Sequence, residues 1–171
     1  MSGTKTIKTK RLTLRKFNDG DLESFYNNWA SNPNVTKYLS WPYHKDLETT
    51  KMVLDMFINS YKDGAYNWAI VLDSLGEPIG NISVVKESNE GLELGYCIGE
   101  SYWNCGYTSE ALASVIDYLF KEGNKVLIAK HDLNNPISGK VMKKCGMTYF
   151  KNDYAENNNG KVLCACYKIE R

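Results

Sequence analysis

Residues 95–111 read GYCIGESYWNCGYTSEA, and this stretch passes from a strand through a glycine-containing turn into a helix. Before the turn, Leu92 to Ile98 alternates apolar and polar side chains, which is typical of a strand with one buried face. After it, apolar residues repeat at helical spacing, and we expect Thr108 or Ser109 to cap the helix. Gly106 allows close backbone approach, and a helix start exposes unpaired N–H groups. The turn is therefore either an anion site or a plain connection, and its context has to decide.

Outward from this stretch, strand and helix patterns alternate along the chain. Before it, we expect a strand over 6–16, a helix capped by Asn18 or Asp19 and stopped by Pro33, a helix from about Asp46 to Tyr61, and two strands, 68–72 and 78–85, joined as a hairpin. After it, we expect a strand over 126–129, a short helix over 138–145 behind the breaker Asn134-Asn135-Pro136, and strands over 147–150 and 162–169 around an Asn-rich turn. Together with 92–98, these patterns predict seven strands and four helices in a single domain spanning residues 1–171.

Charge and composition narrow the class of protein. The formal net charge is +1, and no block of five or six like charges occurs, which argues against a nucleic-acid binder. The first ten residues are polar and basic with no apolar stretch after them, and nothing approaches the roughly 18 apolar residues of a membrane span. We expect a cytoplasmic protein with no nucleic-acid or membrane partner.

The cysteines and histidines do not suggest a metal centre. Five cysteines form no Cys-x-x-Cys pair, and His44 and His131 are far apart in the sequence, so we predict no metal site. An odd cysteine count without an export signal favours reduced thiols over disulfides. Cys164 and Cys166 alternate like strand residues that share a face, and we expect both to be small buried side chains.

Three groups of residues carry a resemblance to a known family. They are, in chain order, the early strand Thr9-Lys10-Arg11-Leu12-Thr13-Leu14-Arg15, the run from Tyr96-Cys97-Ile98 through Trp103-Asn104-Cys105-Gly106-Tyr107-Thr108, and the segment Asn134-Asn135-Pro136-Ile137-Ser138 with Lys144-Cys145-Gly146. In that order they resemble GNAT acetyltransferases, in particular the RimJ/RimL-like branch. The resemblance covers nearly the whole chain.

This resemblance implies a mixed α/β (α+β) fold whose largely antiparallel, seven-stranded sheet splays between its fourth and fifth strands. It also implies acetyl-CoA as cofactor. The pantetheine arm would pair with the fourth strand at Tyr96, Cys97 and Ile98, and Asn135 would bond to the same arm. The turn formed by Trp103, Asn104, Cys105, Gly106, Tyr107 and Thr108 would hold the pyrophosphate.

The turn departs from the family pattern at three positions. Trp103 stands where many members have Gln or Arg, Asn104 where glycine is usual, and Cys105 where a basic residue is frequent. Backbone amides bind phosphate whatever the side chain, provided that Asn104 adopts the required conformation, as asparagine does more readily than most residues. We therefore assign phosphate binding to the backbone around Gly106.

Two residues are candidates for proton transfer. Glu93, on the strand beside the expected thioester, is either the general base that deprotonates the amine or an ordinary surface glutamate. The family's usual acid, a tyrosine in the last helix, falls on Met142 here. Ser138 is either a proton donor or a helix cap. A backbone N–H of Cys97 or Ile98 would stabilise the oxyanion.

An aromatic segment between the first two helices is the candidate acceptor site. Trp41, Tyr43 and His44 fall where this family forms its acceptor wall, although they could equally pack inside or form a dimer contact. The predicted reaction is direct acetyl transfer to a primary amine, either a protein N-terminus or a small molecule, by a monomer or homodimer. The alternative is a catalytically degenerate acyl-CoA-binding module. A nucleotide-binding transferase is disfavoured because no Gly-rich phosphate motif of that kind occurs.

Overall fold

The computed structural model describes residues 3–171, so residues 1 and 2 of the expected domain lie outside the described part. Eight strands form one sheet in the order β1-β2-β3-β4-β5-β6-β8-β7. Their bounds are Ile7–Lys8 (β1), Leu12–Arg15 (β2), Asn67–Leu72 (β3), Glu77–Ser88 (β4), Gly91–Ile98 (β5), Val126–Asp132 (β6), Thr148–Asn157 (β7) and Gly160–Glu170 (β8). Within residues 3–171 every pairing is antiparallel except that of β5 with β6. The predicted fold class is confirmed.

Helices occupy the connections between these strands. The α-helices are Leu22–Phe25 (α1), Pro33–Thr36 (α2), Leu47–Ser60 (α3), Tyr107–Lys121 (α4) and Pro136–Lys144 (α5). The predicted first helix is continuous but irregular, because a 3-10 turn at Asp19–Asp21 precedes α1 and a π-helical turn at Tyr26–Ala30 follows it. Asn18 caps its start, as one of the two expected caps.

The counts of strands and helices differ from the prediction for local reasons. The expected first strand is two strands, since Thr9 N–H donates to the Leu12 carbonyl and Leu12 N–H to Thr9 Oγ1, which folds β1 back onto β2. Pro33 was expected to stop a helix, yet it also starts α2, with Asn32 as its cap. Proline suits the first helical position because no N–H is needed there.

Two helix starts also differ from the prediction. Helix α4 begins directly after Gly106, so neither Thr108 nor Ser109 caps it. Helix α5 begins at Pro136, which leaves Ser138 inside its first turn and free of a capping role. Both helices therefore begin without a side-chain cap, and the N–H groups of their first turns remain available to other partners.

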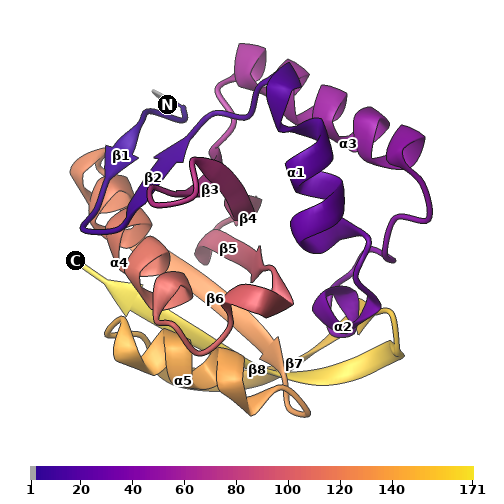
Figure 1. Ribbon diagram of the computed structural model, residues 1–171. Coiled ribbons are helices and arrows are strands. Elements are labelled where there is room, and N and C mark those ends of the chain that lie inside the picture. The colour runs from indigo at the N-terminus through magenta and orange to yellow at the C-terminus, as the bar shows by residue number, and fades with distance from the viewer. Residues whose placement is uncertain (1–2) are drawn as a thin grey trace.

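The sheet separates two apolar cores. One core lies under α4 and α5 and includes Leu112, Ile116, Leu119 and Met142. The other lies under the α1–α3 side and contains the stacked rings of Phe25 and Trp29, with centroids 4.5 Å apart. Figure 1 shows the two groups of helices on opposite sides of the strands. Any group that passes between two strands therefore connects the two faces of the molecule.

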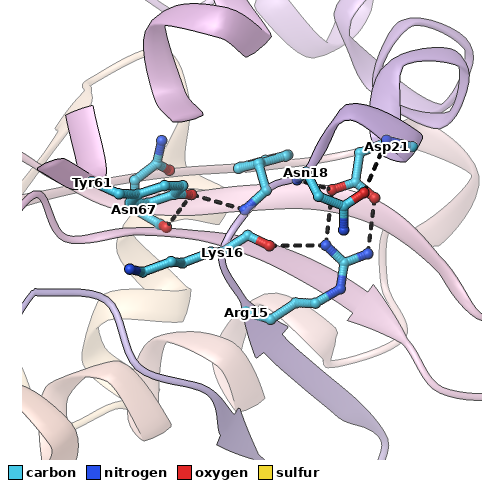
Figure 2. Close-up of polar contacts among 8 residues, drawn as sticks. Arg15, Lys16, Asn18, Asp21, Tyr61 and Asn67 are labelled. Carbon is cyan, nitrogen blue, oxygen red and sulfur yellow. Dashed lines mark hydrogen bonds and ion pairs between the residues drawn. The ribbon is translucent and has the colours of Figure 1, made fainter. Parts of the chain in front are cut away.

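A buried ion pair fixes the passage from β2 into the helical segment. Arg15 donates from both Nη atoms to the Asp21 carboxylate, at 2.8 Å each, and Asn18 N–H donates to the same group (Figure 2). Tyr61 ties this joint to β3, since its hydroxyl accepts from the backbone of Phe17 and donates to the carbonyl of Asn67. These bonds fix the start of the helical segment that begins at Asp19.

Candidate functional site

The sheet opens where its two parallel strands meet. Strands β5 and β6 pair over only three residues, from Leu92 with Leu127 to Leu94 with Ala129. Strand β5 continues to Ile98, and within the described residues its 95–98 edge on that side pairs with no strand. This confirms the expected splay, which falls between β5 and β6 because β1 and β2 are separate strands. An extended ligand can pair with the exposed edge.

The predicted phosphate turn continues directly from this edge. Trp103 donates from its indole nitrogen to the Ile98 carbonyl, at 2.9 Å, and so folds the turn back onto the end of β5. Asn104 has a φ of 59°, the one positive value outside glycine in residues 3–171, and Gly106 has a φ of 81°. The conformation expected of Asn104 is therefore present. It leads into the uncapped start of α4, where N–H groups and the helix dipole favour an anion.

A cavity of about 380 Å³ lies beside this turn. Its walls include Gly106, Ser109 and Cys105 from the turn and α4, Arg11 from the start of β2, and Lys144 from the end of α5. Within the described residues Lys144 forms no ion pair. Glu110 also lines the cavity and pairs with Arg11, so the unpaired Lys144 and the start of α4 supply its net positive charge. This charge suits an anionic ligand such as a phosphate.

A tyrosine and a serine meet on the α4–α5 side of the cleft. The Tyr96 hydroxyl lies 3.1 Å from Ser138 Oγ and also donates to the Ser138 carbonyl, at 3.3 Å. Burial raises the pKa of Tyr96, so the phenol keeps its proton. Met142, at the position of the family's usual acid, is 1% exposed in the core. The sequence predicted Tyr96 for cofactor binding alone and gave no sign that its hydroxyl is a candidate proton donor.

Glu93 lies on the opposite side of the sheet, as the alternation along β5 predicted. Its carboxylate is 3.2 Å from the Lys130 ammonium of β6, and 22% of its side-chain surface is exposed. Burial alone would lower the pKa of Lys130, but the charge and hydrogen bond of Glu93, together with the charges of Cys166 and Asp153, outweigh it and the net pKa is raised. Glu93 is thus half-buried and paired. Lys130 was not predicted, and no sequence signal marks it.

Cys97 lies on the same face as Glu93 and is not a nucleophile. Its thiol donates to Asn81 Oδ1, at 3.1 Å, and packs against the aromatic core. Burial raises its pKa to about 12, so the thiol stays protonated. The predicted oxyanion donors are the N–H groups of Cys97 and Ile98. Each of them points either to the exposed edge of β5 or toward β4. Asn135 starts α5, and its side chain caps nothing.

The three residues of the predicted acceptor wall fall in different environments. Tyr43 is 41% exposed, whereas His44 is 6% exposed and its Nδ1 lies 2.8 Å from Thr50 Oγ1. The Trp41 ring lies 5.3 Å from the His44 ring. The burial of His44 favours packing, one of the alternatives that the sequence left open for this residue. Trp41 and Tyr43 stay predicted contacts.

The tip of the β7–β8 hairpin holds this loop, a connection that the sequence did not reveal. Asn158 donates from its side-chain amide to the carbonyls of Thr36 and Trp41, at 2.8 and 2.7 Å, and its N–H donates to the Leu39 carbonyl. Asn159 adds a bond to the Lys37 carbonyl. The Asn-rich turn was predicted as a hairpin turn, and this is confirmed.

Other predicted features concern redox state, metals and membranes. All five cysteines are free, and Cys164 and Cys166 are buried as expected. Residues 3–171 contain no cluster of three metal-ligating side chains and no helix long and apolar enough to cross a membrane.

Comparison with known proteins finds acetyltransferases both by sequence and by structure. Residues 11–148 match the acetyltransferase (GNAT) domain family. The uncharacterised N-acetyltransferase YnaD of Bacillus subtilis strain 168 is 35% identical over 144 residues, covering 82% of this chain and 81% of that protein. A GNAT-family acetyltransferase from Bacillus anthracis is 30% identical in sequence, with a TM-score of 0.82 over 97% of this chain and 98% of that one.

A further solved structure shares the fold at lower identity. RimL, the ribosomal L7/L12 alpha-N-protein acetyltransferase, in complex with coenzyme A, is 19% identical to this chain. The TM-score is 0.85, over 97% of this chain and 98% of that one. At this identity the likeness concerns the fold.

Proposed function

The chain belongs to the GNAT acetyltransferase family, and on that premise we propose that it transfers an acetyl group from acetyl-CoA to a primary amine in a ternary complex. It is an acyl-CoA-dependent N-acetyltransferase by family. Bound acetyl-CoA supplies the activated thioester carbonyl. The observation that carries the proposal is the unpaired 95–98 edge of β5, which leads straight into the uncapped start of α4.

The arrangement gives each end of the cofactor its own partners. The N–H groups at the start of α4 bind the phosphates of the cofactor, and the cationic side chains of Arg11 and Lys144 lie beside them. The edge formed by Tyr96, Cys97 and Ile98 hydrogen-bonds to the pantetheine arm as an added strand would. The side chain of Asn135, which is free of a capping bond, offers a donor and an acceptor at the start of α5.

Acid and base lie on opposite faces of the sheet. Glu93, on the α1–α3 face, accepts the proton of the incoming ammonium group, because an amine attacks only when neutral. A backbone N–H of Cys97 or Ile98 stabilises the charge that develops on the carbonyl oxygen. On the α4–α5 face, the Tyr96 hydroxyl, with Ser138 beside it, donates a proton to the departing sulfur. The splay between β5 and β6 lets the reacting carbonyl contact both faces.

The acceptor is proposed as a primary amine of a protein N-terminus or of a small molecule. RimL, a relative in fold, is named for acetylating a ribosomal protein at its α-amine. In this chain the exposed ring of Tyr43 and the ring of Trp41 would contact the acceptor. The five free thiols fit a reducing compartment, and we place the protein in the cytoplasm.

The decisive experiment follows free coenzyme A release. The protein is incubated with acetyl-CoA and a panel of small amines and N-terminal peptides, and acetyl-CoA binding is measured by calorimetry. Turnover with at least one amine supports the proposal. Binding without turnover for any amine favours the acyl-CoA-binding module, for which Met142 at the acid position is the specific observation. Absence of binding contradicts both functions.

A further inference from the structure

Arg11, directly before β2, contacts the phosphate turn at two points and Glu110, in the first turn of α4, at a third. Its Nη1 donates to the Cys105 carbonyl at 2.9 Å, and its guanidinium carbon lies 4.4 Å from the centroid of the Tyr107 ring. Its Nε donates to the Glu110 carboxylate at 2.7 Å. A single side chain that lies far away in the sequence thus touches the residue before Gly106, the residue after it, and the first turn of α4.

The guanidinium is itself held in place. The Glu110 carboxylate accepts three hydrogen bonds in all. They come from Arg11 Nε, from the Arg11 backbone N–H at 2.8 Å and from Thr9 Oγ1 at 2.7 Å. Burial alone would raise the pKa of Glu110, but these hydrogen bonds outweigh it, and the pKa lies below its ordinary value. Glu110 is therefore ionised near neutral pH, and the planar guanidinium has a fixed charged partner.

The turn needs such a brace because its backbone is unusual. Asn104 and Gly106 both have positive φ, two positions apart, and the former is a conformation that side-chain-bearing residues seldom adopt. The peptide between Cys105 and Gly106 is planar, so fixing the direction of the Cys105 carbonyl also fixes the opposite direction of the Gly106 N–H. The Arg11 bond to that carbonyl sets how the turn presents its amides.

Arg11 also leaves one donor group free. Within the described residues its Nη2 forms no hydrogen bond, and a Cβ placed on Gly106 would lie 3.3 Å from it. The same side chain lines the cavity beside the turn. Residues 103–108 contain no basic side chain. The guanidinium donor that reaches this turn therefore comes from the segment just before β2.

We propose that Arg11 is a positioning residue for the phosphates of the acetyl donor. It holds the 105–107 backbone in the anion-binding conformation and presents its free Nη2 group, the donor that residues 103–108 lack, to the cavity beside the turn. This inference rests on the proposed acetyl-CoA-dependent function. It assigns a specific consequence to one residue, namely preference for a donor that carries phosphates.

The test compares two acetyl donors. Acetyl-CoA carries the phosphates, whereas S-acetylpantetheine has the same thioester arm without them. In Arg11→Ala, kcat/KM for acetyl-CoA should fall at least about tenfold, with kcat at saturation nearly unchanged, while kcat/KM for S-acetylpantetheine stays near the wild-type value. Lys10→Ala is the matched control. It also removes one positive charge, from the exposed side chain of the residue next to Arg11. It should keep the wild-type preference.

The outcomes separate this inference from the function itself. If Arg11→Ala lowers kcat/KM equally for both donors, or for neither, Arg11 is only structural and the inference is overturned. If Arg11→Ala does not fold, Arg11→Lys decides, because lysine keeps the charge but cannot form the three contacts together. Arg11→Lys should then lose part of the preference for acetyl-CoA over S-acetylpantetheine. A full wild-type preference would overturn the proposal that Arg11 holds the turn in place. A wild-type protein that uses neither donor overturns the proposed function and this inference with it.

Discussion

The carboxylate of Glu93 lies 3.2 Å from the ammonium of Lys130, next to the point where pairing between β5 and β6 stops. Asp153 of β7 lies 3.9 Å from the same ammonium. The pair thus joins the two strands at the mouth of the splay. The contact holds the Glu93 carboxylate beside the open edge of β5, which is the position that the proposed role requires.

Replacing Glu93 with glutamine tests that role. Glu93→Gln keeps the size of the side chain but removes the base, so kcat at pH 7 should fall about 100-fold while the Kd for acetyl-CoA changes little. The defect should shrink as the pH rises toward the pKa of the acceptor amine, because more acceptor then arrives neutral. Turnover across pH and calorimetry measure both effects.

The control for this variant is Glu90→Gln, which removes another carboxylate, paired with Lys151 at 2.8 Å on the surface. It should leave kcat unchanged. A Glu93→Gln enzyme with a wild-type pH–rate profile would remove Glu93 from the mechanism.

The Tyr96 hydroxyl is the second group to test. Tyr96→Phe should lower kcat by about 10-fold to 100-fold, because the departing sulfur loses its proton donor, while acetyl-CoA binding stays near wild type. Burial raises the pKa of Tyr96 above its ordinary value of 10.0. The phenol therefore keeps its proton below pH 10, and the wild-type rate should show no loss on this account up to that pH.

Ser138→Ala separates the two hydroxyl groups. If Ser138 only orients Tyr96 through their 3.1 Å contact, Ser138→Ala should cost less activity than Tyr96→Phe. The reverse order, measured by steady-state kinetics, would make Ser138 the donor and Tyr96 its support.

Periodicity predicted most of the fold because most elements bury one face. The alternation from Leu92 to Ile98 and the helix after Gly106 are both present as expected. The errors occur where short-range hydrogen bonds decide. Thr9 turns one predicted strand into two, and Pro33, which was expected only to end the first helix, also starts α2. Such turns depend on single side chains and leave no periodic signal.

The candidate site was predictable only along continuous sequence. The edge at 95–98 and the turn at 103–108 are neighbours in the chain, so the resemblance located them together. Arg11, Lys130 and Asn158 lie far from them in sequence, and tertiary packing alone brings these side chains to the site. The sequence could not choose between wall and packing for His44 for the same reason, because its burial depends on its contact with Thr50 of α3.

Gly106 can be tested against a glycine with the same backbone conformation. Gly106→Ala places a side chain at a φ of 81° and should destabilise the fold by about 1–2 kcal/mol. The new methyl group would also lie 3.3 Å from Arg11 Nη2 and crowd the turn, so the Kd for acetyl-CoA should rise. Thermal unfolding and calorimetry measure the two effects separately.

Gly76→Ala is the matched control, since Gly76 has a φ of 75° in the β3–β4 turn with no atom within 4 Å of the added carbon. It should lose similar stability and keep full acetyl-CoA affinity. Equal affinities in both variants would argue against phosphate binding at Gly106.

Asn158 allows a test of the loop that the hairpin holds. Asn158→Ala removes two hydrogen bonds, to the carbonyls of Thr36 and Trp41. Both carbonyls can then bind water, so the free energy of unfolding should drop by only about 1 kcal/mol. The larger effect should be local, and hydrogen exchange should become faster across residues 36–44, because the loop loses its anchor to the tip of β7 and β8.

The same variant connects this anchor to catalysis. If Trp41 and Tyr43 contact the acceptor, a loosened loop should raise the KM for the amine and leave the KM for acetyl-CoA unchanged. Asn158→Asp keeps the shape but loses the donating amide, and it should behave like the alanine variant. Asn152→Ala, which removes an exposed contact with Tyr149 on β7, should change neither exchange nor KM. Unchanged exchange in both Asn158 variants would show that the loop keeps its position without the Asn158 side chain, whereas faster exchange with an unchanged amine KM would place the acceptor elsewhere.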